Sequence, residues 1–353
     1  MRVLLVDLNG PFGPLRSFAD LIPSLRETGI DVTVLTPETR ADGLSTYLHG
    51  AELMTFEDPS PRVRDLDIVR VAKSLSGTTS LIHANSTSAA RGAALAALQI
   101  RRPLVVHLRN SALSAGERRF VRALRYIPIT TRFVAVSASA SAVAHMDGRS
   151  LVIPDPVVVH ASRLHGPPAI PARIGIVANQ QPTKGLDIAV AIAALTKDLP
   201  VVFEVFGSAG ADPLVNPFIS EQFEFIHREG LEDRLIFHGE VPDLADHLGG
   251  LDVMLITSRR ESFSRVAAEA MLTGLPLVAP MIPGLSDTID GGRWAVTYNV
   301  ADARSAARAL RAVLEDPATS MERACAARAW ANDRFAPGHV AERMAALYRN
   351  LAG

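Results

Sequence analysis

The sequence has a single cysteine, almost no net charge and no long apolar run, and each of these absences excludes some classes of protein. Its 353 residues hold a single cysteine, Cys325, which excludes an internal disulfide and a cysteine-rich zinc site. The formal net charge is −1, so nothing overall favours a nucleic acid or an acidic partner. No apolar run approaches the roughly 20 residues of a membrane-spanning helix. The first run, starting at Val3, is cut short by Asp7. We therefore expect a cytoplasmic protein, since this run is too short for a signal peptide.

What the sequence does have is an alternation of short apolar runs and longer helical stretches. The expected strands of the first half are VLLVD, DVTVLT, PLVVHL and RFVAV, and a helix with the sequence LRSFADLIPSLRETG is expected to end at Gly29. The expected strands of the second half are RIGIVA, VVFEVFG, RLIFHGEV, DVMLITS and PLVAP. Runs that are apolar on both faces suit parallel strands covered by helices on each side. The pattern therefore predicts an α/β fold with doubly wound sheets.

The length and one proline-rich stretch indicate two domains. A chain of 353 residues is longer than one typical domain. The segment His160–Ala172 contains one glycine and three prolines and is typical of a hinge. We expect two Rossmann-like domains whose carboxyl strand edges face each other across a ligand-binding cleft.

The stretch ESFSRVAAEA keeps two carboxylates, Glu261 and Glu269, in an apolar segment. A strand is expected to end near Ser258, and a helix is expected to run from about Ser262 to Gly274. Eight residues of helix span roughly 12 Å, too far for an acid and base pair acting on one bond. The Ala and Val residues around Glu269 predict a largely buried carboxylate, which is costly without a partner.

The start of this expected helix also has the character of an anion site. Backbone N–H groups near Phe263, Ser264 and Arg265 would lie at its positive end. A ligand with hydroxyls at both ends and a diphosphate between them, such as a nucleotide sugar, would suit this pattern. The alternative is structural: one glutamate complements the helix dipole and the other faces water.

The residues around the two glutamates carry a family resemblance. GLEDRLIFHGEVPDLADHLGGLDVMLITSRRE and EAMLTGLPLVAP resemble retaining glycosyltransferases of the GT-B fold, of the group 1 or family 4 type. The resemblance implies that Glu261 contacts the donor sugar and that Glu269 binds the ribose of the nucleotide. It places Lys184, in NQQPTKGLD, at the donor diphosphate, where an ammonium would stabilise the leaving group. It also places His107 near the donor sugar and Gly13 at an N-terminal donor contact.

The same resemblance implies the organisation of the chain and its reaction. Residues 1–165 would form an acceptor-side domain, residues 166–336 a domain that binds the nucleotide sugar, and the helix 337–353 would pack back on the first domain. The reaction would transfer a hexose from a nucleoside diphosphate sugar to an acceptor hydroxyl, with retention of configuration. No cofactor is expected, and we expect that no metal is needed. The acceptor would be lipid-linked or an oligosaccharide.

Some positions depart from the family pattern and keep other functions open. Ala178 stands where relatives commonly have an arginine, Ser262 and Ser264 stand where glycines are usual, and Pro14 follows Gly13. The main alternative is a non-catalytic nucleotide-sugar binder of the same fold. A nucleotide-sugar epimerase is less favoured because of the paired glutamates. A dehydrogenase is disfavoured because NGPFGP lacks the G-x-G-x-x-G spacing.

The segment from Arg101 to Arg132 is rich in arginine, with Glu117 as its one acidic residue. Four of these arginines flank an apolar helical face in GERRFVRALRYIP. The arginines are Arg118, Arg119, Arg122 and Arg125, and the apolar face is Phe120, Val121, Leu124 and Ile127. This helix could dock on an anionic membrane, at the inner face of which a lipid-linked acceptor would lie. The favoured alternative is a helix packed on its own sheet with its arginines in water.

Overall fold

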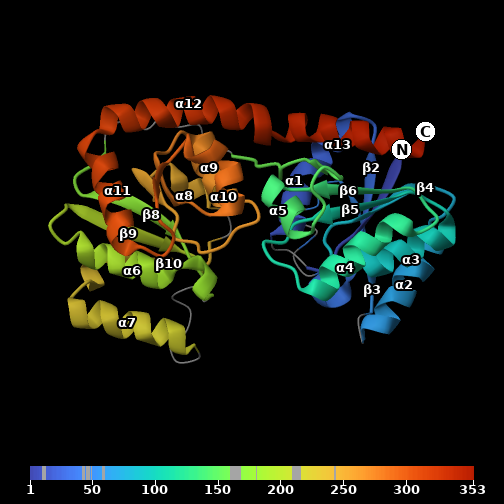
Figure 1. Cartoon of the computed structure of the whole chain (residues 1–353), viewed down its shortest axis with the longest axis horizontal. Coiled ribbons are helices and arrows are strands. Elements are labelled where there is room, and N and C mark those ends of the chain that lie inside the picture. Colours follow the sequence, from blue (N-terminus) through green and yellow to red (C-terminus); the bar gives the residue numbers. More distant parts are fainter. Residues whose placement is uncertain are drawn as a thin grey trace. The chain divides into compact units, whose positions relative to one another are not determined.

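The computed structural model describes the chain except residues 10–12, 42–43, 45–47, 49, 58–59, 160–167, 180, 209–215 and 242–243. The chain divides into two compact units (Figure 1). Unit 1 comprises Met1–Val158 and Arg334–Gly353, and unit 2 comprises Val159–Asp333. Most of the expected hinge, residues 160–167, lies outside the described residues, and the domain boundaries expected from the sequence stay a prediction.

The described part of unit 1 contains a parallel sheet in the order β3-β2-β1-β4-β5-β6-β7. Its strands are β1 (Arg2–Val6), β2 (Asp31–Pro37), β3 (Glu52–Phe56), β4 (Thr79–Ala84), β5 (Leu104–Leu108), β6 (Thr131–Ala135) and β7 (Ser150–Val152). Its helices are α1 (Pro14–Glu27), α2 (Pro61–Ser74), α3 (Ala90–Ile100), α4 (Ala115–Ala123), α5 (Ala138–Val143) and α13 (Pro337–Ala352), with the short turns η1 (Glu38–Arg40) and η3 (Leu124–Tyr126). The strand order turns back between β1 and β4, as in a doubly wound fold.

The core of unit 1 joins residues from both of its chain segments. Figure 1 shows α13 beside α1, and these two helices pack together. Val340, Met344 and Tyr348 of α13 recur every four residues, so they share one helical face, and all three are buried in the core with Leu5 and Phe18. The segment 334–353 is therefore an integral part of unit 1.

The described part of unit 2 repeats the arrangement, with a parallel sheet in the order β10-β9-β8-β11-β12-β13. Its strands are β8 (Ala172–Val177), β9 (Val201–Phe206), β10 (Leu235–Gly239), β11 (Val253–Leu255), β12 (Leu277–Pro280) and β13 (Val296–Tyr298). Its helices are α6 (Leu186–Leu195), α7 (Pro217–Glu229), α8 (Ala245–Leu248), α9 (Arg265–Thr273), α10 (Pro283–Thr288), α11 (Ala303–Glu315) and most of α12 (Pro317–Phe335), with the turns η4 (Pro182–Lys184), η6 (Glu232–Arg234) and η7 (Asp290–Gly292). The order reverses between β8 and β11.

The predicted fold class is confirmed: both sheets are parallel and Rossmann-like. Every strand expected from an apolar run is present, although β11 ends at Leu255 rather than near Ser258. The residues after Leu255 still follow β12, since the Ile256 N–H donates to the Val278 carbonyl. The chain then leaves the sheet, and the side chain of Thr257 bonds to another loop instead.

Candidate functional site

Two loops of unit 2 meet at the carboxyl ends of β8 and β11, the neighbouring strands between which the order reverses. Open α/β sheets bind their ligands at such a point. The loop after β8 carries Lys184, and the loop after β11 carries Glu261. Lys184 Nζ lies 2.8 Å from Glu261 Oε1, and Ser258 Oγ donates to the same oxygen at 2.8 Å. The two charged side chains are 32% and 13% exposed. The structure thus joins two predicted site residues that are 77 positions apart.

Hydrogen bonds from Thr257 and Arg259 fix the two loops to each other. Thr257 Oγ1 donates to the Lys184 carbonyl at 2.8 Å. The Arg259 guanidinium binds both carboxylate oxygens of Asp187, at 2.8 and 2.5 Å, and this bond raises the pKa of Arg259. Gly185 has a φ of +68°, and a Cβ there would lie 2.1 Å from the Thr257 carbonyl oxygen. Only glycine allows this approach, so Lys184 is held at a defined place.

The loop with Glu261 also rests on the start of α10. A Cβ on Gly284 would lie 2.3 Å from the Glu261 carbonyl oxygen, so the loop packs directly against the backbone of α10. Thr288, one turn further along α10, donates through Oγ1 to the Gly284 carbonyl at 3.0 Å. The hydroxyl oxygen of Thr288 also accepts the N–H of Ser264, at 3.2 Å. One hydroxyl therefore ties α10 to the residue that begins the next helix.

The helix that carries Glu269 starts later than the sequence predicts. It was expected from about Ser262, but α9 begins at Arg265 with Ser264 as its N-cap, whose Oγ accepts the Ala267 N–H at 3.4 Å. The Ser264 N–H goes to Thr288, so the expectation that it is open to an anion is wrong. Glu261 lies in the loop before the helix, and the helical spacing of 12 Å does not apply to the pair. The helix ends as predicted, with Gly274 in the left-handed region.

Glu269 is 4% exposed, which confirms the prediction of a buried carboxylate. Its Oε1 lies 2.8 Å from Nε of Arg265, one turn earlier on α9. A buried carboxylate is stabilised by such a charge-assisted bond. Phe263, on the loop just before α9, is 9% exposed. The predicted roles of these residues toward a ligand stay predictions.

His107 belongs to unit 1, whereas Lys184, Glu261 and Glu269 belong to unit 2. It lies on β5 and is 2% exposed. Its Nδ1 lies 3.2 Å from Nε2 of His83. Burial lowers the pKa of His107 well below its usual value, and the positive charge of a neighbouring arginine adds to the effect.

Gly13 precedes α1 with a φ of +46°, and Pro14 is the first residue of the helix. Its carbonyl accepts the Ser17 N–H at 3.1 Å. Sequence reasoning missed a pair at the point where the strand order of unit 1 reverses. Asn85, after β4, donates through Nδ2 to Oδ2 of Asp7, after β1, at 2.7 Å, and both residues are fully buried. Asp7, which ends the first apolar run, was the one signal in the sequence that could have indicated this pair.

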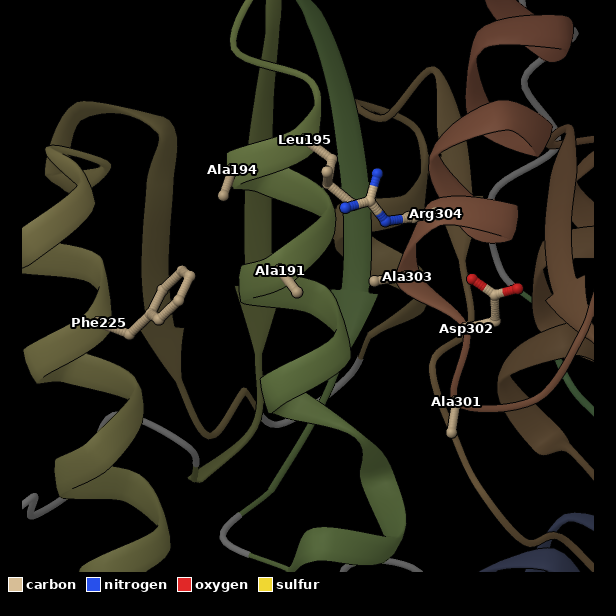
Figure 2. Close-up of a pocket in the computed structure, with 8 residues that line it drawn as sticks. All are labelled: Ala191, Ala194, Leu195, Phe225, Ala301, Asp302, Ala303 and Arg304. Carbon is tan, nitrogen blue, oxygen red and sulfur yellow. The ribbon is translucent and has the colours of Figure 1, made fainter.

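A separate pocket of about 480 Å³ lies between α6, α7 and the start of α11 in unit 2 (Figure 2). It is lined by Ala191, Ala194, Leu195, Phe225, Ala301, Asp302, Ala303 and Arg304. Most of these side chains are small or apolar. Asp302 already accepts the Ser305 N–H at 2.9 Å as the N-cap of α11. None of the predicted site residues lines this pocket, and we assign it no ligand.

The arginine-rich helix α4 packs on its own unit. Val121 and Leu124 are 0% and 4% exposed, while Arg119 and Arg122 are exposed. Phe120 and Ile127, the other two residues of the expected apolar face, are part-buried, and the choice between the two sequence interpretations stays a prediction. Within the part of the chain that the structure describes, no helix is long and apolar enough to cross a bilayer. Nor do the described His, Cys, Asp and Glu residues form a group of three or more that could hold a metal ion.

Comparison with known proteins decides the family. The profile described as glycosyl transferases group 1 matches residues 171–316. The profile described as glycosyl transferase 4-like domain matches residues 12–159. The chain belongs to the group 1 glycosyltransferases. The resemblance seen in the sequence is therefore confirmed. Lys184, Glu261 and Glu269 lie in the first matched segment of this glycosyltransferase, and His107 lies in the second.

Individual relatives agree with this assignment. The lipopolysaccharide core biosynthesis mannosyltransferase LpsB of Rhizobium meliloti is 25% identical over 96% of this glycosyltransferase and 94% of its own length. The 2-deoxystreptamine glucosyltransferase of Streptomyces kanamyceticus is 33% identical, but over only 35% of this chain and 33% of its own. The crystal structure of HepE from Anabaena in complex with UDP-glucose matches with a TM-score of 0.82 and 22% identity, covering 99% of this chain and 100% of that one. The fold is accordingly GT-B.

Proposed function

We propose that this glycosyltransferase moves a hexose from a nucleoside diphosphate sugar to an acceptor hydroxyl, with retention of the anomeric configuration. The product would be a glycan, a glycolipid or a glycosylated metabolite. The observation that carries the proposal is the Lys184–Glu261 pair beside α9, where the strand order of unit 2 reverses. A charged pair at this position suits a ligand with both a phosphate and hydroxyl groups. The complex of HepE with UDP-glucose supports the donor class.

In this proposal Lys184 acts on the donor diphosphate. Its ammonium carries three N–H donors and uses one on Glu261, which fixes its position. Negative charge grows on the diphosphate as the bond to the sugar breaks, and a fixed cation stabilises that charge more than it stabilises the ground state. The positive end of α9 adds to the effect through Phe263 and Arg265. This positive charge comes from the protein, so we propose that the reaction needs no metal ion.

Glu261 and Glu269 would bind hydroxyl groups at the two ends of the donor. The carboxylate of Glu261 is part-exposed and can accept hydrogen bonds from a sugar. Glu269 would accept bonds from the ribose. Neither carboxylate is assigned as a nucleophile, so we propose that departure and attack occur on the same face of the sugar. The leaving phosphate would then take the proton of the acceptor hydroxyl. Gly13 and His107 of unit 1 would complete the donor contacts.

The first experiment is thermal stabilisation of the wild type and Glu269→Gln by UDP, GDP, ADP and dTDP, and then by the matching sugar nucleotides. We expect one base to stabilise the wild type and to have little effect on the variant. Glu229→Gln is the matched control, since Glu229 lies on α7 and pairs with Lys197 at 3.0 Å. Equal stabilisation of wild type and Glu269→Gln would remove the ribose assignment.

Turnover tests the chemistry. With the donor known, the anomeric coupling constant of the product in a proton NMR spectrum reports its configuration. Retention is expected, and activity should persist in excess EDTA. An inverted product, or complete loss of activity that magnesium restores, would contradict the proposed mechanism.

A second function is a nucleotide-sugar binder without turnover. It is favoured by Ala178, which takes the place of a common family arginine and is 1% exposed. A Cβ on Gly207 would lie 2.2 Å from the Ala178 carbonyl oxygen, so this part of the chain is closely packed. Tight donor binding with no transfer and no slow donor hydrolysis would support this function.

We also propose that the arginines of α4 and η3 contact an anionic surface by charge alone. Arg119 and Arg122 are exposed, Arg118 and Arg125 are part-buried, and Val121 and Leu124 of the apolar face are buried. Such contact would bring a lipid-linked acceptor near without insertion, and it would weaken as salt screens the charges. Sedimentation with vesicles of phosphatidylserine and phosphatidylcholine tests it. No binding at low salt would rule this contact out.

A further inference from the structure

His107 is the end of a buried hydrogen-bond chain in unit 1 that reaches the C-terminal helix. The Tyr348 hydroxyl, on α13, lies 2.5 Å from Nδ1 of His83, on β4. Nε2 of His83 lies 3.2 Å from Nδ1 of His107, on β5. All three residues are at most 2% exposed. The Phe18 and His83 rings are nearly perpendicular with their centroids 5.2 Å apart, and this packing holds His83 in place.

Arg109 determines which atoms donate and which accept in this series of hydrogen bonds. Its NH2 lies 3.3 Å from Nδ1 of His107, and a guanidinium can only donate. It is held there by an ion pair with the buried Asp155. His107 Nδ1 must therefore accept, and it accepts from His83 Nε2–H as well. A neutral His83 with its proton on Nε2 has a lone pair on Nδ1, so Tyr348 donates to it.

The three groups keep these protonation states. Burial, with the charge of Arg109 as the second cause, lowers the pKa of His83 to about 3. Burial likewise lowers the pKa of His107, with Arg109 and then His83 as further causes. Burial raises the pKa of Tyr348 well above its usual value, so its phenol keeps the proton. At neutral pH both imidazoles are uncharged.

The proton of His107 then sits on Nε2. That nitrogen is buried and has no hydrogen-bond partner among the residues the structure describes. A buried N–H donor without an acceptor is costly, so its acceptor is expected to come from a ligand. We propose that His83 and Tyr348 are positioning residues that hold His107 as an Nε2–H donor to a hydroxyl oxygen of the donor sugar. This inference rests on the proposed function.

The assignment separates two roles that a histidine at this place could have. In this tautomer Nε2 has no lone pair, and the lone pair of Nδ1 is used by Arg109 and His83. His107 therefore orients the sugar by donating a hydrogen bond and does not act as a general base. His107 therefore recognises an oxygen atom of the sugar that can accept a hydrogen bond.

The tautomers can be read directly in the wild type. In protein labelled with ¹⁵N-histidine, two-bond ¹H–¹⁵N spectra at pH 7 distinguish Nε2–H, Nδ1–H and imidazolium rings. We expect both His83 and His107 as Nε2–H. An Nδ1–H ring or an imidazolium at His107 would overturn the assignment, and this result does not depend on any ligand.

Calorimetry then tests whether His107 binds the sugar of the donor. The probes are UDP and UDP-glucose, with GDP and GDP-mannose and ADP and ADP-glucose as further pairs. The measured quantity is the affinity gained from the sugar, which is the ratio of the affinity for the sugar nucleotide to the affinity for the matching nucleoside diphosphate. Removing the donor in His83→Leu should reduce this gain about tenfold, the usual worth of one hydrogen bond. His83→Gln retains an N–H that can reach His107 and should restore most of it. Affinity for the bare nucleotide should not change.

Tyr348→Phe removes only the hydroxyl and should lower the gain in the same direction by a smaller factor. Tyr126→Phe is its control, since Tyr126 is 79% exposed on η3. An unchanged gain in both His83→Leu and Tyr348→Phe would overturn the positioning role. If the wild type binds no sugar nucleotide, the proposed function and the sugar assignment fall together, while the NMR result still decides the tautomer.

Discussion

The backbone carbonyl of Glu261 packs directly against Gly284, where a Cβ would lie only 2.3 Å away. Glu261 reaches Lys184 from this loop, so the position of the charged pair depends on a residue of α10 that bears no side chain. The relationship joins two strand ends, since the loop follows β11 and α10 follows β12. A change at Gly284 should therefore reach the ligand site through the backbone.

Gly284→Ala tests this dependence. The added methyl group has to displace the Glu261 loop, so we expect donor affinity to fall about tenfold and unfolding free energy to fall by about 1–3 kcal/mol. Calorimetry and urea unfolding measure the two effects. Gly249→Ala is the control, because a Cβ there meets no described atom within 4 Å. Equal behaviour of the two variants would show that the close contact is unimportant.

Lys184→Gln removes the cation and keeps much of the side-chain volume. We expect kcat to fall about 100-fold, the usual effect of losing one group that stabilises transition-state charge. Steady-state kinetics with the identified donor measure the effect. Lys197→Gln removes another lysine paired with a glutamate in unit 2, at 3.0 Å from Glu229, and should leave kcat unchanged. A small effect of Lys184→Gln on kcat with a large effect on KM would place Lys184 in ground-state binding only.

Arg265→Met removes the guanidinium that lies 2.8 Å from Oε1 of the buried Glu269. We expect the unfolding free energy to fall by about 2–4 kcal/mol, because the loss of one partner of a buried ion pair is costly. Adding Glu269→Gln should recover part of the loss. Arg70→Met breaks a 2.7 Å pair with Asp67 in which the arginine is 81% exposed, and it should change stability by less than about 1 kcal/mol. No recovery in the double variant would mean that Arg265 stabilises the fold through other contacts.

The buried histidines predict a pH dependence of stability. His83 is neutral in the folded protein down to a pKa of about 3, whereas an unfolded histidine takes up a proton near pH 6.5. Below pH 6.5 the unfolded state binds more protons, so stability falls as pH is lowered, by about 1.4 kcal/mol per pH unit for each such histidine. His107 and Tyr348 lie within hydrogen-bond distance of His83, and the positive charge of Arg109 also acts on it.

Urea unfolding at pH 7.0, 6.0 and 5.0 measures this slope. His83→Gln should have a shallower slope, by an amount that approaches about 1.4 kcal/mol per pH unit toward pH 5.0 and is smaller between pH 7.0 and 6.0. His227→Gln removes a histidine whose side chain is 88% exposed and should leave the slope unchanged. Parallel slopes in the wild type and His83→Gln would mean that His83 is not kept neutral by burial.

The sequence predicted the fold well because parallel strands and their helices have local signals. Runs such as RIGIVA and VVFEVFG are apolar on both faces, and they form β8 and β9. Two of the strands that were not predicted, β3 and β13, are short and part-exposed, so their residues lack such a run. Burial of Glu269 was also predictable, since its neighbours are small and apolar.

The start of α9 shows where local signals end. ESFS offers two serines that could cap the helix. The choice of Ser264 depends on Thr288 of α10, whose hydroxyl oxygen accepts the Ser264 N–H. Gly284, His83 and Tyr348 were missed for the same reason. Their contacts join residues far apart in the sequence, and nothing in the neighbouring residues indicates them.

The division of unit 1 into two segments has a consequence for biogenesis. Unit 2 is a continuous stretch that can complete its own core as soon as it leaves the ribosome, because domains fold as units during synthesis. Unit 1 is made first but cannot close its core until α13 arrives, since Val340, Met344 and Tyr348 fill it. The apolar face of α1 that packs with α13 must therefore wait, uncovered, through the whole synthesis of unit 2. During that interval it is a natural place for a chaperone to bind.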